Sequence, residues 1–150
     1  MTSEGQSENS CPLCDFDDRN VIIADDDYVF AIISENPINP YHVLVVPKEH
    51  YESFNRLPDF LASHLFLLAK RLSAAVRQAS QAHAITHLSD DGVSWGGFDL
   101  VPHYKLHIIP RFKGDGTPIV WHRQSNLGSL ARTQFADAVR SALQRQARKE

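Results

Sequence analysis

The stretch from His103 to Arg111 reads His-Tyr-Lys-Leu-His-Ile-Ile-Pro-Arg, in which basic and apolar residues alternate over the first six positions. Because successive side chains of a β-strand point to opposite faces, this alternation predicts a strand with one basic face, formed by His103, Lys105 and His107. Two imidazoles that flank an ammonium suit a site for a phosphate or another anion. A solvated outer face with incidental histidines is the alternative. The opposite, apolar face consists of Tyr104, Leu106 and Ile108.

Length and composition indicate one folded domain. The chain has 150 residues, of which 43% are hydrophobic, and this is enough to fill a single core. Residues 1–10 are rich in Ser, Glu, Gln and Asn, so we expect them to be disordered. We expect residues 11–150 to form a single domain.

The overall charge excludes some classes of partner. A formal net charge of −3 at pH 7 argues against general binding to nucleic acid, which needs many clustered lysines and arginines. No apolar run approaches the roughly eighteen residues that cross a bilayer, and the polar start of the chain lacks the basic residues of a signal peptide. We therefore expect a cytoplasmic protein that binds neither nucleic acid nor membrane.

The apolar residues change their period along the chain. β-Branched and aromatic runs predict strands at residues 21–24, 28–33, 42–47 and 84–88, in addition to the 103–111 segment. From Pro58 to Ala82 the apolar residues recur at intervals of three and four, which predicts one long helix. We expect Ser129 to cap a last helix whose apolar face carries Ala131, Phe135, Val139 and Leu143. The pattern predicts an α+β fold with an antiparallel sheet.

Two large apolar residues of the long helix do not belong to its main stripe. Phe66 and Leu67 lie beside the stripe and form a second apolar patch. Exposed apolar patches of this kind mark interaction surfaces. We expect this one to contact another subunit.

Two segments resemble the histidine triad (HIT) superfamily of nucleotide hydrolases and nucleotidyl transferases. The first is Asn36 to His50, which reads Asn-Pro-Ile-Asn-Pro-Tyr-His-Val-Leu-Val-Val-Pro-Lys-Glu-His, and the second is Val101 to Arg111. The resemblance covers about residues 11–116. It implies a five-stranded antiparallel sheet with helices, and a homodimer that joins two such sheets.

The family motif is His-x-His-x-His, whose middle histidine attacks the α-phosphorus of a nucleotide. Here His103 and His107 match the first and third histidines, His42 matches an upstream histidine of the phosphate pocket, and Lys105 stands at the middle position. A lysine attacks only after it loses its proton, and free lysine is almost wholly ammonium at neutral pH. Lys105 is therefore as well suited to holding a phosphate as to attacking it.

Two further positions depart from the family pattern. Ser34 stands where the family usually has an Asp or Asn that binds the ribose, which implies a weaker grip on the sugar. Asp99 stands where a Gln or Ser usually lies near the leaving group. A carboxylate beside a phosphate repels it unless a cation intervenes, and Lys105 is a suitable partner for Asp99.

Cys11 and Cys14 form a C-x-x-C motif, which by itself fits a metal site, a redox pair or an incidental reduced pair. The resemblance to the zinc-bearing branch of the family implies that His50 and His103 complete a metal site. A Cys₂His₂ set binds zinc tetrahedrally with no open position, so the expected role is structural.

The expected function is that of an atypical HIT protein. The resemblance implies binding of a phosphate-containing small molecule, most simply a nucleotide, with nucleotidyl hydrolase or transferase chemistry if the protein is active. The alternatives are a catalytically silent protein that binds a nucleotide or a partner, and a redox protein that uses Cys11 and Cys14.

Overall fold

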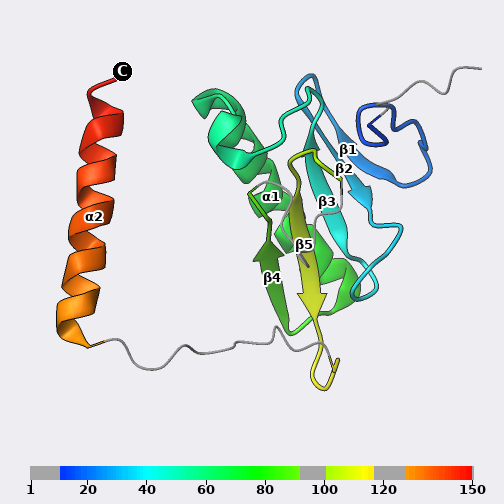
Figure 1. The fold of residues 1–150 in the computed structure, drawn as a ribbon. Coiled ribbons are helices and arrows are strands. Elements are labelled where there is room, and N and C mark those ends of the chain that lie inside the picture. The colour runs from blue at the N-terminus through cyan, green and yellow to red at the C-terminus, as the bar shows by residue number, and fades with distance from the viewer. Residues whose placement is uncertain (1–10, 92–100, 117–127, 150) are drawn as a thin grey trace, which may run out of the picture. The chain divides into compact units, whose positions relative to one another are not determined.

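The computed structural model describes residues 11–91, 101–116 and 128–149 (Figure 1). The contacts within the chain divide it into two compact units, residues 1–116 and residues 117–150. Each unit is described by itself below. The single domain expected over residues 11–150 stays a prediction, and the expected disorder of residues 1–10 lies outside the described part of the chain.

The first unit contains a five-stranded antiparallel sheet with the strand order β1-β2-β3-β5-β4. This confirms the predicted sheet and the α+β class. β3 is the central strand, as expected of a nearly continuous apolar run. The strands span Ile22–Asp25 (β1), Val29–Ile33 (β2), Val43–Pro47 (β3), Ala84–Leu88 (β4) and Leu106–Arg111 (β5).

The long helix α1 spans Asp59–Ser80 and packs on one face of the sheet (Figure 1). It begins after Pro58, which occupies the N-cap, and it ends at Ser80, before the C-cap residue Gln81, which adopts the left-handed conformation. A short 3₁₀ turn, Phe54–Arg56, precedes it. The predicted apolar stripe is confirmed at Leu61, Leu65, Leu72 and Val76, which are buried. Leu68 and Ala79 were also expected on it, but Leu68 is half-buried and Ala79 is exposed, whereas Ala69 is buried.

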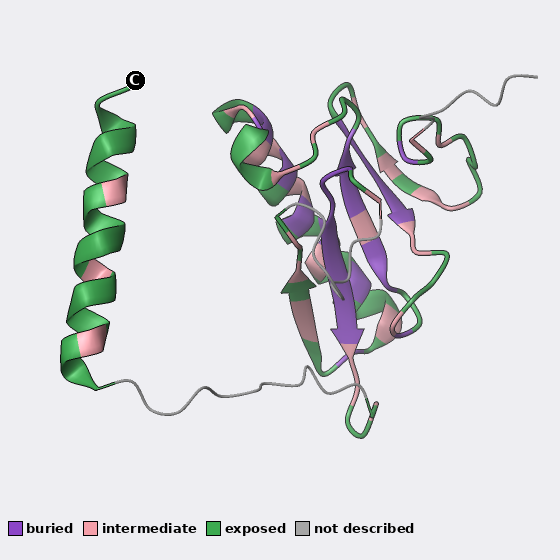
Figure 2. Ribbon diagram, in the orientation of Figure 1, coloured by how far each residue is buried: buried purple, intermediate pink, exposed green. Residues whose placement is uncertain are grey.

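Buried residues lie on both faces of the sheet. On β2, Val29 and Ala31 belong to the cluster under α1, whereas Phe30 and Ile32 belong to a cluster on the other face. The second cluster includes Leu13 and covers that face with the segment that carries the cysteines. Figure 2 shows the buried residues concentrated on β2, β3 and β5, whereas β4 is exposed or half-buried.

The basic segment differs from the prediction at its start. β5 begins at Leu106, so His103 and Lys105 precede the strand. The reason is that the Tyr104 N–H donates to the carbonyl of Tyr51, at 2.6 Å, and thus leaves the ladder with β3. The alternative of a solvated face was wrong, because the segment is buried, while the apolar face does join the core through Tyr104, Leu106 and Ile108.

The second unit contains the helix α2, Ser129–Ala147. Its N-cap is Gly128 with no side-chain cap bond, so the expected cap at Ser129 was wrong by one residue. The apolar residues are confirmed to lie in a helix, and Phe135, Val139 and Leu143 are exposed. Among the described residues, no helix is long and apolar enough to cross a membrane.

Candidate functional site

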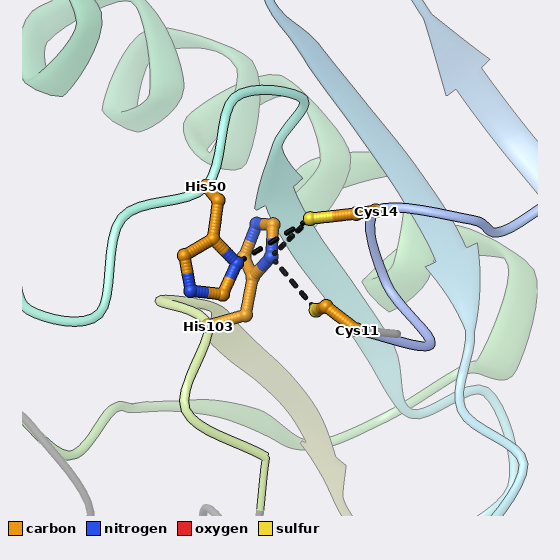
Figure 3. Close-up of side chains that lie close together, drawn as sticks. All are labelled: Cys11, Cys14, His50 and His103. Atoms are coloured by element: carbon orange, nitrogen blue, oxygen red, sulfur yellow. Dashed lines mark hydrogen bonds between the residues drawn. The ribbon is translucent and has the colours of Figure 1, made fainter. Parts of the chain in front are cut away.

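Four side chains from three separate segments converge on one point (Figure 3). Cys11 and Cys14 precede β1, His50 follows β3, and His103 precedes β5. Their potential ligand atoms all lie within 4.8 Å of one another. The Nδ1 atom of His103 lies 3.3 Å and 3.4 Å from the two sulfurs, and the Nδ1 atom of His50 lies 3.3 Å from Cys14 Sγ. The cluster is compatible with a bound metal ion such as zinc.

The backbone fixes the ring of His103 for this role. Its Nε2–H donates to the carbonyl oxygen of Pro47 at 2.8 Å, so in the neutral ring Nδ1 presents its lone pair to the sulfurs. Such a bond to the second ring nitrogen is how metal-binding histidines are commonly oriented. His103 is buried, and this burial lowers its pKa, which favours the neutral form that a metal requires.

The Cys14 thiol is poorly suited to ionise in the absence of a cation. The pKa of Cys14 is raised to about 11, mainly by desolvation and further by the hydrogen bond and the charge of Cys11. A divalent cation offsets both the desolvation and the repulsion between thiolates, because it binds the thiolates directly. The donor set, the proximity and the oriented imidazole therefore fit a metal ion. The described residues show both cysteines as free thiols.

A second group pairs His42, which directly precedes β3, with His107 on β5. His42 Nε2 lies 2.9 Å from His107 Nδ1, and the Ile38 N–H donates to His42 Nδ1 at 3.0 Å. Since Nδ1 of His42 accepts, its proton lies on Nε2 and is donated to His107. Because Nδ1 of His107 accepts this proton, the hydrogen of the His107 ring itself lies on Nε2. Burial, and then the charge of His107, lower the pKa of His42 to about 4.

Lys105 stands between His103 and His107 in the sequence and lines a cavity of about 470 Å³. Its Nζ donates to the carbonyl oxygens of Val101 and His103, both at 3.1 Å. Ser34 lines the same cavity, and its N–H donates to the carbonyl of His42 at 2.8 Å. The rest of the wall is mostly apolar and includes Leu13, Phe16, Ile32, Ile33 and Leu44.

The structure therefore brings together most of the residues that the sequence indicated. Ser34 and Lys105 share a cavity, and His42 pairs with His107, although neither histidine lines that cavity. Asp99 and its expected contact with Lys105 lie outside the described residues.

Asn39 has a role that the sequence analysis did not assign. It is buried, and its Nδ2 donates to the carbonyl of Pro110 at 2.9 Å and to Asp115 Oδ2 at 3.1 Å. Asp115 is held in turn by two bonds from Arg111. These contacts attach the loop that precedes His42 to the end of β5 and to the segment that follows it. The Asn39-Pro40 pair is typical of a loop, and it gives no indication of these contacts.

Comparison with known proteins identifies the family. The HIT domain matches residues 16–114, and the chain belongs to this family. An uncharacterized HIT-like protein of Saccharolobus solfataricus is 33% identical over 105 residues, which are 70% of this chain and 74% of that protein. The bis(5'-adenosyl)-triphosphatase of Dictyostelium discoideum is 36% identical over 86 residues, which are 57% of this chain and 56% of that protein.

A solved structure supports the same assignment. The crystal structure of a HIT family member from Bacillus subtilis superimposes with a TM-score of 0.79 at 25% identity. The match covers 89% of this chain and 96% of that chain. The sheet and helices described above are therefore those of the HIT fold.

The low pKa of His42 predicts a dependence of stability on pH. Unfolded His42 takes up a proton near pH 6.5, whereas folded His42 does so only near pH 4, so the unfolded state binds more protons between these values. The stability contributed at neutral pH is lost as the pH falls through this window, by an amount on the order of 2 kcal/mol. Urea unfolding at pH 7 and pH 4.5 should show a smaller loss for His42→Asn than for the unmodified protein.

The exposed His83 provides the matched control. His83→Asn should keep the full loss of stability between the two pH values. If His42→Asn also keeps it, the buried neutral imidazole is not the cause.

Proposed function

We propose that this protein binds a nucleotide and holds its phosphate with the Lys105 ammonium and the His42–His107 pair. The single observation that carries the proposal is a buried lysine at the edge of a largely apolar cavity, two residues before His107, which pairs with His42. The ammonium and the Nε2–H of His107 are donors that suit phosphate oxygens. A cavity of about 470 Å³ lies within the usual range for small-molecule sites.

The family relationship supports a nucleotide rather than another anion. The Dictyostelium relative is named for hydrolysis of a dinucleoside triphosphate. In this chain, Phe16, Ile32 and Leu44 offer apolar surface of the kind that a base or ribose covers. Ser34 offers one hydroxyl group to the sugar, which supports binding with a weaker ribose contact.

The chemistry at Lys105 favours holding over attack. In place of the middle histidine of the motif, a lysine amine can form a phosphoramidate by attack of its lone pair on the α-phosphorus, with departure of the leaving group. Here the N–H groups of Lys105 are directed at two carbonyl oxygens, which suits a cation that binds. A catalytically silent nucleotide-binding protein is thus favoured over a working nucleotidyl hydrolase or transferase.

Substitutions at Lys105 distinguish a lysine that only binds the phosphate from a lysine that attacks it. If Lys105 only binds, the unmodified protein should bind a nucleoside monophosphate in calorimetry and scarcely hydrolyse a nucleoside phosphoramidate. Lys105→His should then raise hydrolysis by at least about tenfold, because it restores an imidazole nucleophile. The gain should be partial and should increase when Asp99→Gln is added.

The opposite result would identify Lys105 as the nucleophile. Activity would then increase with pH as the ammonium loses its proton, Lys105→Ala would abolish it, and mass spectrometry would find a nucleotidyl adduct on Lys105. Lys48→His, at an exposed lysine, should leave binding and hydrolysis unchanged. Failure of the unmodified protein to bind any nucleotide would contradict the proposal as a whole.

We also propose that Cys11, Cys14, His50 and His103 hold a structural zinc ion. The four donors form a complete tetrahedral set, so the ion would link the N-terminal segment to the segment before β5 without taking part in chemistry. A redox pair is the alternative use of the two cysteines.

Elemental analysis of protein purified without chelator should find about one zinc per chain. His50→Asn should lower that content markedly, whereas His83→Asn, at an exposed histidine outside the cluster, should not. Metal-free protein with a Cys11–Cys14 disulfide would instead support the redox alternative.

We propose, finally, that the protein forms a two-fold homodimer through α1. Phe66 and Leu67 are 44% and 58% exposed, and the adjacent β4 is an edge strand of the sheet. An isologous contact would cover both features.

Light scattering at micromolar concentration should therefore give the mass of two chains. Leu67→Glu should shift the mass to that of one chain, because a buried carboxylate without a partner opposes association. Ile23→Glu, at an exposed position on the opposite edge strand, should not. A monomeric unmodified protein would contradict the proposed dimer.

A further inference from the structure

The segment from Val101 to Lys105 contributes to two cavities. Val101 lines a cavity of about 530 Å³ beside Cys11, Cys14 and His50, and it also lines the 470 Å³ cavity of Lys105. His103 lies within this segment and belongs to the metal cluster. The metal cluster and the phosphate site thus share one short piece of backbone.

Lys105 ties this segment together. Its Nζ donates to the carbonyls of Val101 and His103, both at 3.1 Å. The carbonyl of Val101 also accepts the backbone N–H of His103 at 2.8 Å. Because Lys105 is only 5% exposed, water has little access to these bonds and cannot readily replace them. The ammonium therefore fixes the backbone on both sides of the His103 side chain.

The position of His103 depends on that backbone. Its Nε2–H bond to Pro47 sets the plane of the ring, but the distance of Nδ1 from the sulfurs of Cys11 and Cys14 follows from where its Cα lies. Metal sites tolerate ligand distances only within about 0.2 Å of their preferred values. A small shift of the Val101–Lys105 segment would therefore weaken the set of ligands.

We infer that Lys105 is a positioning residue for the metal centre, although it is not a member of the cluster. The inference rests on the proposed binding of metal by the Cys₂His₂ set. Lys105 acts through the carbonyls of Val101 and His103, which keep Nδ1 of His103 facing the two sulfurs. One ammonium then serves both the phosphate site and the metal site.

Lys105→Met tests this inference, since methionine fills similar space and has no N–H donor. Zinc affinity is measured by competition with a chelator, and the geometry of the site by the visible spectrum of the Co²⁺-loaded protein. We expect affinity to fall about tenfold, as for the loss of groups that orient metal ligands, and the Co²⁺ bands to shift. Unchanged affinity and an unchanged spectrum overturn the inference.

Lys48→Met is the control for the loss of positive charge. Lys48 lies two residues before His50 in the sequence, but its Nζ pairs with Asp25 at 2.6 Å and its side chain is 42% exposed. We expect less than about a twofold change in zinc affinity, because exposed pairs contribute little. An effect equal to that of Lys105→Met would show that charge alone is responsible and would overturn the inference.

Two further variants test the positioning role of Lys105 if Lys105→Met does not fold. Lys105→Gln has a polar end one atom closer to the backbone, so it should meet the two carbonyls poorly and weaken zinc binding. Lys105→Arg keeps its N–H donors at full reach and should restore affinity to within about threefold of the original. Equal affinity in both variants overturns the inference, whereas an unmodified protein that binds no metal overturns the proposed metal site instead.

Discussion

Three basic side chains are buried in one short segment, and each is tolerated there because its nitrogen atoms have polar partners. His103, Lys105 and His107 are 1%, 5% and 7% exposed. An unpaired polar group at such a position would cost roughly 1–3 kcal/mol. The path of the chain before β5 satisfies this constraint with backbone carbonyls and one imidazole, which come from Pro47, Val101, His103 itself and His42.

These partners also place the two candidate sites next to each other. The central strand β3 ends at Pro47, which orients His103, and it pairs Leu44 with His107 in the ladder with β5. His50 follows the same strand and reaches the metal cluster. A metal bound there would join the cysteine segment to the strands that carry the proposed phosphate site. The stability of the first unit and the geometry of its pocket would then depend on the same contacts.

Much of the fold followed from the periods of the apolar residues. The long helix and the five strands appear where the patterns predicted them, because burial on one face requires a fixed spacing in each kind of element. The start of β5 was not predicted correctly, because the alternation indicated a strand from His103 and the strand begins at Leu106. The extent of a strand depends on which backbone pairs with it, and the N–H of Tyr104 finds Tyr51, a residue outside the sheet. The cap of α2 was likewise misplaced by one residue, at Ser129 instead of Gly128.

The sequence by itself determined which residue types alternate along the basic segment. Its C-x-x-C motif identified Cys11 and Cys14 as candidate metal ligands, and its resemblance to the HIT family added His50 and His103. Only the tertiary structure decided how these groups are held. His42 and His107 are 65 positions apart, and Cys11 and His103 are 92 positions apart. The carbonyls that bind Lys105 and the contacts of Asn39 are main-chain and long-range features that side-chain identity does not encode. Spacing within one element fixes which face a residue occupies, whereas a partner across the sheet is fixed only when the strands and the helix pack together.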